Sequence, residues 1–225
     1  MWILSSLGRP DRIRKVVESY VWGDESLVLL TLWQDDPRLQ EYLEQMWPRS
    51  WSIEIVPMRG NGPTYNEILR RYPNEPHYGF LADDAILDVM GMLRKLEQDA
   101  GGWNVAYAND QYHQDRICTM PCIGGDLVRA VGYLSPPDFM HMGIDCVWHE
   151  IGRTLGVLRY HAELTYTHAH PLLGLAAVDE TYLQAQLLSV GHEQAFRGWK
   201  MGGELDAIKR RVTARSSSLG EHYGH

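Results

Sequence analysis

Two groups of side chains in this sequence could together hold a divalent cation. Asp83 and Asp84 are adjacent carboxylates at the end of a short apolar run, and His168 and His170 are two residues apart. On a strand, this second spacing would place both imidazoles on one face. Carboxylate oxygens and imidazole nitrogens are a suitable ligand set for an ion such as Mn²⁺. Each group also has a structural interpretation, because an aspartate often caps a helix and a histidine can satisfy backbone groups.

A third feature is a carboxylate that could take part in proton transfer. Asp145 lies near the start of a predicted helix over residues 144–155. It is interpreted either as a helix cap or as a base held over an acceptor hydroxyl. Two glycine-rich sites, Gly60-Asn61-Gly62 and Gly124-Gly125, are interpreted as close-approach loops for phosphate or sugar, or as ordinary turns. Neither has the spacing of a Walker or dinucleotide-binding motif.

Alternating apolar strands and amphipathic helices must position these residues. Apolar runs predict strands over 1–7, 26–33 and 51–58, in the run that ends in Asp83-Asp84, and over 103–108. Helical spacing predicts helices over 11–21, 37–46, 64–72 and 87–99. This alternation predicts an α/β fold, with a mainly parallel, mixed sheet covered by helices on both faces in a three-layer α/β/α sandwich.

Ligands of such sheets bind beyond the carboxyl ends of the strands. Polar residues follow every predicted strand of the first half, and we expect them to lie along one edge. They are Arg9 and Asp11, Asp35 and Asp36, Arg59 and Asn61, Asp83 and Asp84, and Asn109 and Asp110.

Past residue 110 the alternation ends. We expect a strand over 116–123, helices over 127–133, 144–155 and 179–190, and an extended segment over 158–168. Residues 1–190 would form the main domain and 191–215 a C-terminal helical extension. The serine-rich stretch 216–225 is predicted to be a disordered tail.

Composition and charge narrow the function classes. The 225 residues are 44% hydrophobic and 22% charged, as in a soluble globular protein, and contain no apolar run of about 20 residues that could span a membrane. No signal peptide is recognisable, and the three cysteines are too few for a disulfide framework, so a cytoplasmic location is expected. A net charge of −8 argues against a globally basic nucleic-acid binder. Two clusters remain as acidic-ligand patches or solvated faces: Arg9, Arg12, Arg14 and Lys15, and Lys209, Arg210, Arg211 and Arg215.

The order of these parts resembles that of the GT-A glycosyltransferases, in particular small family 2-like members of bacteriophages and bacteria. The resemblance covers roughly residues 1–180 and rests on Arg9-Pro10, Phe80-Leu81-Ala82-Asp83-Asp84, Asp145 and His168-Ala169-His170. The sequence departs from the family at Ala82, which stands where a strict Asp-X-Asp motif has its first acid. It also lacks Gly-Ser after the acids of Gln34-Asp35-Asp36-Pro37.

The resemblance implies a GT-A-like fold and a role for each matching residue. Asp83 and Asp84 would hold Mn²⁺ or Mg²⁺ against the diphosphate of a sugar nucleotide, with His168 or His170 completing the metal shell. Arg9, Asp35 and Asp36, with Asn66 as a further candidate, would contact the nucleoside, and Asp83 would also lie against the donor. Asp145 would be the general base of an inverting reaction.

The implied activity is metal-dependent transfer of a sugar from a nucleotide diphosphate, UDP-glucose or a similar donor, to a hydroxyl group. The sequence does not identify the acceptor. A hydroxymethylated pyrimidine in DNA is one candidate if the protein is phage-encoded and works in the host cytoplasm. Two alternatives remain, a non-catalytic module that binds nucleotide sugars or glycans, and a metal-dependent phosphohydrolase.

Overall fold

The centre of the molecule is one mixed β-sheet. The structure is a computed structural model that describes residues 1–20, 26–57 and 60–219. The strand order of the sheet is β3-β2-β1-β4-β7-β6-β8-β5. The strands are β1 (Trp2–Ser6), β2 (Val28–Trp33), β3 (Trp51–Val56), β4 (His77–Leu81), β5 (Ala85–Leu87), β6 (Val105–Asn109), β7 (Cys122–Gly124) and β8 (Leu158–His168).

Most strands of the sheet point the same way. β1 pairs in parallel with β2 and β4, and β2 pairs in parallel with β3. β7 lies antiparallel between β4 and β6, β6 and β8 are parallel, and β5 is antiparallel to β8. The carboxyl ends of β1, β2, β3, β4, β6 and β8 therefore meet at one edge, where the sequence predicts a site.

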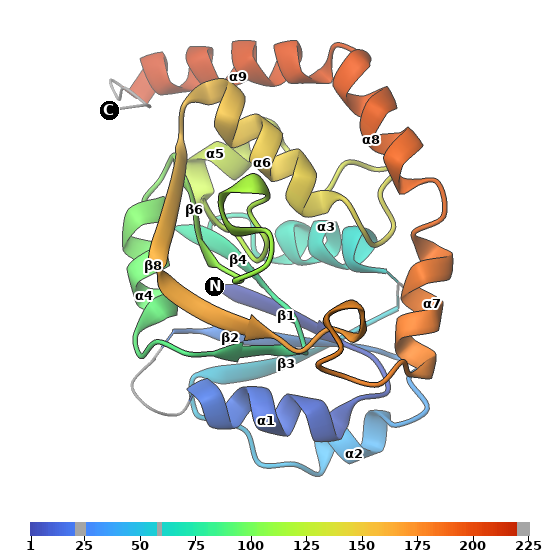
Figure 1. Cartoon of the computed structure of the whole chain (residues 1–225). Coiled ribbons are helices and arrows are strands. Elements are labelled where there is room, and N and C mark those ends of the chain that lie inside the picture. The colour runs from blue at the N-terminus through green and yellow to red at the C-terminus, as the bar shows by residue number, and fades with distance from the viewer. Residues whose placement is uncertain (21–25, 58–59, 220–225) are drawn as a thin grey trace.

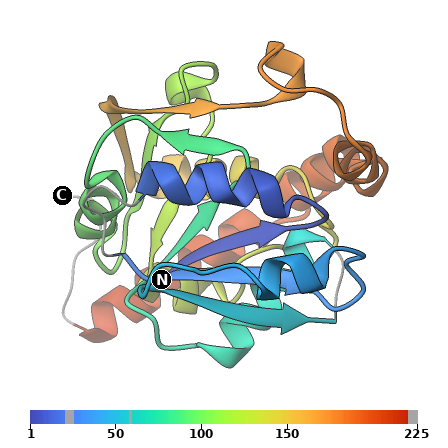
Figure 2. The same ribbon diagram turned by 90° about the horizontal axis from the view of Figure 1, so that it is seen from below.

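Helices cover both faces of the sheet. They are α1 (Pro10–Tyr20), α2 (Leu39–Leu43), α3 (Asn61–Arg71), α4 (Met92–Ala100), α5 (Gly125–Val131), α6 (Ile144–Leu155), α7 (Glu180–Leu188), α8 (His192–Met201) and α9 (Glu204–Leu219), with 3-10 turns η1 (Gln114–Arg116) and η2 (Pro171–Leu173). In Figure 1, α1 and α2 lie below the sheet and α3, α5 and α6 above it. Figure 2, seen from below, shows α1 lying across the near face.

Side-chain alternation in β1 explains the three layers. Ile3 belongs to the core that contains α3, α5 and α6 residues, whereas Trp2 and Leu4 belong to the core under α1 and α4. Neighbouring residues of a strand point to opposite faces, so an entirely apolar strand needs a helix layer on each side. The predicted three-layer α/β/α sandwich around a mainly parallel, mixed sheet is confirmed.

The predicted helix over 87–99 begins late, and the helix-cap interpretation of Asp83-Asp84 is wrong. These residues form a turn after β4, and Ala85–Leu87 continue as β5. β5 pairs with the end of β8, with Ile86 opposite Thr167, so the backbone finds its partners in a strand 81 residues away. The helix α4 starts only at Met92, after Gly91 in a left-handed conformation with φ of 73°.

Two other predicted elements are shorter in the structure. The strand over 116–123 is reduced to β7, because Met120 adopts a positive φ angle of 50° that interrupts an extended chain. The helix over 37–46 is reduced to α2, because the side chain of Asp36 accepts a hydrogen bond from the backbone nitrogen of Arg38 (2.8 Å) and forms a turn first. The predicted ends of two elements, at residues 21 and 58, lie outside the described residues.

The C-terminal segment is helical and α9 packs against the domain. Ile208 and Val212 are fully buried in the core beside α5 and α6. The predicted tail is helical over 216–219, and the hydroxyl groups of Ser216 and Ser217 donate to the carbonyl of Thr213 inside α9. Residues 220–225 lie outside the described part. No helix in the described chain is long and apolar enough to cross a membrane.

Candidate functional site

A cleft of about 370 Å³ opens at the carboxyl edge of the sheet. Its walls come from the end of β1, the turn after β4, the start of α6, the end of β8 and α7. The candidate residues that line it are Arg9, Asn61, Asp83, Asp84, Asp145, His168 and His170. Topology therefore gathers residues that are up to 161 positions apart (Arg9 to His170) in the sequence.

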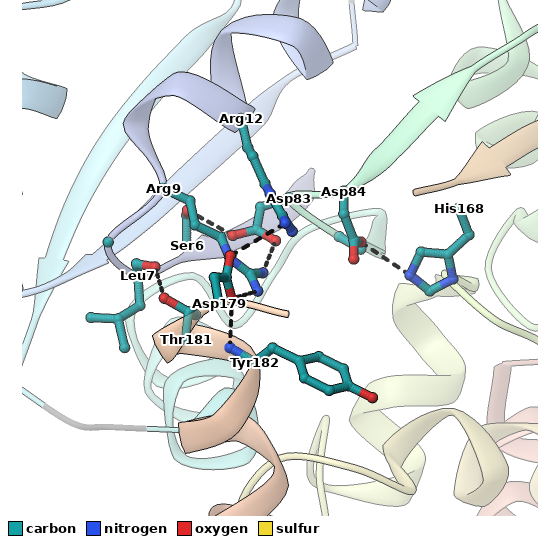
Figure 3. Close-up of polar contacts among 12 residues, drawn as sticks. Ser6, Leu7, Arg9, Arg12, Asp83, Asp84, His168, Asp179, Thr181 and Tyr182 are labelled. Atoms are coloured by element: carbon teal, nitrogen blue, oxygen red, sulfur yellow. Dashed lines mark hydrogen bonds and ion pairs between the residues drawn. The ribbon is translucent and has the colours of Figure 1, made fainter. Parts of the chain in front are cut away.

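Asp83 and Arg9 form a buried ion pair at the floor of this cleft. Arg9 Nη1 donates to Asp83 Oδ1 at 2.9 Å, and Ser6 Oγ donates to Asp83 Oδ2 at 2.9 Å. A buried carboxylate requires such partners, since an unpaired charge is costly away from water. Burial alone would lower the pKa of Arg9, but the charge of Asp83 and the hydrogen bonds to Asp179 raise it. Arg9 is therefore a permanent cation in the cleft (Figure 3).

Asp84 is directed away from Arg9 and toward β8. Its Oδ1 lies 3.0 Å from His168 Nε2 (Figure 3). Two backbone features fix this pair, because Ala85 lies opposite His168 in the β5–β8 register and Ala169 donates its amide to the carbonyl of Asp84 at 2.8 Å. Burial alone would raise the pKa of Asp84, but the hydrogen bond and charge of His168 hold it below 3.8. Burial likewise opposes protonation of His168, and Asp84 nevertheless raises the pKa of His168 above 6.5.

His170 lies beside His168, but a strand does not place it there. β8 ends at His168, so the predicted same-face strand spacing is wrong for this pair. The two rings nevertheless have centroids 5.2 Å apart, and the ring of Tyr182 lies 5.1 Å from that of His170. Burial, followed by the charge of His168, lowers the pKa of His170, which leaves a neutral imidazole in the cleft.

The predicted four-residue metal site is not assembled. In the parts of the chain that the structure describes, no three His, Cys, Asp or Glu side chains are arranged to hold a metal ion. Asp83 is taken up by Arg9 and Ser6, which explains its absence from such a set. Asp84 and His168 are in contact and provide the oxygen and nitrogen that Mn²⁺ accepts. These two residues fit a cation that takes its remaining ligands from substrate phosphate oxygens.

Asp145 occupies the first turn of α6. The helix follows Gly143, whose φ of 87° is accessible to glycine, and Asp145 Oδ1 accepts the amide of Cys146 at 2.9 Å. It is therefore in the helix and is not its N-cap residue. Burial raises the pKa of Asp145 above 3.8, which makes its carboxylate a stronger base than an exposed one.

Three predicted nucleoside contacts do not line the cleft. Asp36 Oδ2 accepts the amide of Gly8 at 2.8 Å, so it holds the loop after β1. Asn66 Oδ1 accepts the amides of Leu134 and Ser135 at 3.0 and 3.1 Å, so it holds the loop after α5. Asp35 is an exposed residue of the turn after β2. Of the other edge residues, Asp110 caps the 110–114 turn through its hydrogen bonds to backbone amides, and Arg59 lies outside the described residues.

The glycine-rich sites serve close packing of the chain on itself. A Cβ atom at Gly62 would lie 1.8 Å from the carbonyl oxygen of Phe139, and one at Gly124 would lie 2.3 Å from the backbone of Gly102. Neither site is a turn, because Asn61 and Gly62 begin α3, Gly124 ends β7 and Gly125 begins α5. Gly62 brings α3 against the loop that leads to Asp145.

Sequence reasoning missed the contribution of α7. Asp179 contacts Arg9, Thr181 Oγ1 donates to the carbonyl of Leu7 at 2.7 Å, and Tyr182 lines the cleft (Figure 3). A local signal existed only for Asp179, as an acid before a predicted helix. The basic cluster 9–15 is also not one surface, because Arg9 and Arg12 turn toward Asp179.

No family model and no curated protein matches the sequence. Several solved structures have a similar fold. S. aureus TarS superposes with a TM-score of 0.57 at 10% identity, over 84% of this chain and 39% of that one. S. aureus TarS 1-349 gives 0.55 at 11% identity, over 99% and 92%. The mannosyltransferase PcManGT from Pyrobaculum calidifontis, solved with GDP-Man and Mn²⁺, gives 0.57 at 11% identity, over 99% and 76%.

These likenesses show the fold. The chain has the GT-A-like fold of glycosyltransferases, as the order of its motifs implies. It spans well under half of the first TarS structure.

Proposed function

We propose that the protein is a metal-assisted glycosyltransferase that takes a sugar from a nucleotide diphosphate, with UDP-glucose or a similar donor, and passes it to a hydroxyl group. The observation that carries the proposal is the cleft itself. It combines a carboxylate–imidazole pair, a fixed arginine cation and a carboxylate with a raised pKa at the carboxyl edge of a GT-A-like sheet. The GDP-Man and Mn²⁺ bound by PcManGT support the same ligand classes.

The donor side of the cleft would bind the diphosphate. Asp84 and His168 would hold a divalent cation, which neutralises charge on a departing diphosphate when bound. Arg9 adds a cation held in place by Asp83, and its guanidinium group can donate two parallel hydrogen bonds to phosphate oxygens. His170, a neutral imidazole beside them, can accept or donate one hydrogen bond.

The acceptor side would supply the base. Asp145 takes the proton of the acceptor hydroxyl. At the same time, the hydroxyl oxygen bonds to the anomeric carbon and the bond from that carbon to the diphosphate breaks. A carboxylate whose pKa is raised by burial is better suited to this transfer near neutral pH than an exposed aspartate. A single displacement of this kind inverts the anomeric configuration.

The test is release of nucleoside diphosphate. The full-length protein is incubated with Mn²⁺ and separate UDP-, GDP- and dTDP-sugars, with sugar, glycan and hydroxymethylated-DNA acceptors. We expect one donor to be consumed, release to require the cation, and Asp84→Asn to slow it about 100-fold or more because a ligand of the cation is lost. Asp88→Asn is the matched control, since Asp88 is an exposed acid four residues away at the end of β5.

The two alternative functions give other results. Binding of the nucleotide with neither release nor transfer indicates a non-catalytic module. Cleavage of simple phosphate esters without a sugar donor indicates a phosphohydrolase. Full activity of Asp84→Asn would contradict the role given to Asp84.

A further inference from the structure

Two arginines contact the carboxylate of Asp179, the N-cap residue of α7. Arg9 lies just before α1, and Arg12 lies in the first turn of α1. Arg9 Nη2 donates to Asp179 Oδ1 at 2.6 Å and Arg9 Nε to Oδ2 at 2.8 Å, a two-bond fork (Figure 3). Arg12 Nη2 lies 3.3 Å from Asp179 Oδ2, and the amide of Tyr182 donates to Oδ1 at 2.8 Å. The fork that guanidinium makes with a carboxylate is the one it also makes with phosphate.

The donors at this place exceed what the carboxylate can accept. Arg12 Nη1 is buried and has no hydrogen-bond partner in the described structure. A buried donor without a partner is unfavourable, so the arrangement suits an anion with more acceptor oxygens. A phosphate group offers three oxygens on one centre, whereas Asp179 offers two.

The segment that supplies Asp179 is only weakly packed on the domain. From residue 170 to 188, no side chain that the structure describes is buried. Leu183 and Leu187 of α7 are 47% and 73% exposed. Besides the ion pairs of Asp179, the hydrogen bond from Thr181 to Leu7 ties α7 to the end of β1. An element with so few buried contacts opens at a low free-energy cost.

We infer that Arg9 and Arg12 form the binding site for a phosphate group of a nucleoside diphosphate, and that the Asp179 carboxylate occupies this site when the ligand is absent. The identity of the ligand rests on the proposed function. Ligand and Asp179 then compete for the same guanidinium groups, so diphosphate binding releases the start of α7 from Arg9 and Arg12. Arg12, which is outside the residues placed in the transfer reaction, becomes a contact of the donor.

The competition is measured with inorganic pyrophosphate and no divalent cation, by calorimetric titration of the full chain. Asp179→Asn keeps an N-cap side chain for α7 and removes the charge, so we expect it to bind pyrophosphate about tenfold more tightly than the unmodified protein. Arg12→Gln should bind it about tenfold more weakly, because one charged donor is lost. Glu180→Gln, which removes an exposed charge from the same helical turn without touching Arg9, should stay within about twofold.

A second measurement needs no variant. Pyrophosphate should speed backbone hydrogen exchange of residues 180–188 in the unmodified protein, because Asp179 loses its anchor. Unchanged affinity in Asp179→Asn, unchanged affinity in Arg12→Gln, or unchanged exchange of α7 would each overturn the inference and leave a structural ion pair. These readouts involve neither a sugar nor turnover. A protein that shows the competition but consumes no sugar nucleotide therefore contradicts the proposed function and not this site.

Discussion

Asp83 and Asp84 are neighbours in the sequence with different chemical environments. Asp83 is bound to Arg9 and Ser6, whereas Asp84 is bound to His168. A single carboxylate with one imidazole partner is thus available to a cation, and its neighbour orients an arginine. This division accounts for a site that has only part of the predicted ligand set and yet keeps both positive and negative groups at the proposed diphosphate position.

Replacement of Asp145 by asparagine tests its proposed role as the general base. We expect Asp145→Asn to lose about 100- to 10,000-fold in kcat and to bind nucleoside diphosphate as before, since general-base catalysis is worth about that much. The raised pKa has a definite sign in the pH profile: the proposed base works when ionised, so the rate of the unmodified protein falls as pH drops through a value above 3.8. Steady-state rates against pH and nucleotide titration measure both effects. Equal loss of binding and transfer would make Asp145 a structural residue, and Asp138→Asn in the exposed loop before α6 is the control.

At the scale of helices and strands, contacts between elements that are distant in the sequence position the site. The β5–β8 register places His168 beside Asp84, and the close approach of α3 to the loop at residues 139–140 supports the start of α6. Gly62 makes that approach possible, because its amide donates to the carbonyl of Met140 at 3.1 Å and a side chain would collide with Phe139. The loop that leads to Asp145 thus depends on a glycine that does not line the cleft.

A methyl group at this glycine should therefore disturb both stability and catalysis. We expect Gly62→Ala to lower the free energy of unfolding by about 1–3 kcal/mol, as overpacking does. The rate of transfer should fall about 10- to 100-fold, because a shift of the loop at residues 139–140 also moves Asp145 at the start of α6. Urea unfolding and turnover assays measure the two effects. Gly198→Ala in α8, where a Cβ meets nothing within 4 Å, should change stability by no more than about 1 kcal/mol. If Gly62→Ala behaves like this control, the loop does not depend on that contact.

At the scale of the whole molecule, the C-terminal helix α9 packs into the same core as α5 and α6. α9 buries Ile208 and Val212 against the layer that contains α5 and α6. Figure 1 shows this helix crossing the top of the molecule, above α5 and α6. Arg211 donates to the carbonyl oxygens of Ala130 and Val131 at the end of α5 at 3.2 and 3.1 Å. This helix completes one face of the sandwich, so its loss would lower the stability of the whole fold.

Truncation of one buried side chain in α9 measures this integration. Ile208→Ala should lower the free energy of unfolding by about 2–5 kcal/mol and keep a single cooperative transition, since it leaves a cavity in a shared core. The control is Lys209→Ala at the exposed neighbour of Ile208, which should change the free energy of unfolding by less than about 0.5 kcal/mol. Thermal and urea unfolding followed by circular dichroism report both. A separate early transition in Ile208→Ala would show that α9 unfolds as an independent extension.

The sequence by itself determined the α/β class, the mainly parallel sheet and the edge where the cleft opens. These follow from local patterns, because period-2 and period-3.6 apolar spacing specifies elements and parallel topology then brings strand ends together. The tertiary structure alone decided which partners the predicted site residues have. Arg9 meets Asp179 across 170 positions, and Asp36 and Asn66 are taken by backbone amides of other loops. Such contacts leave no periodic signal, since they arise from how the whole chain packs and from the need of buried polar groups for partners.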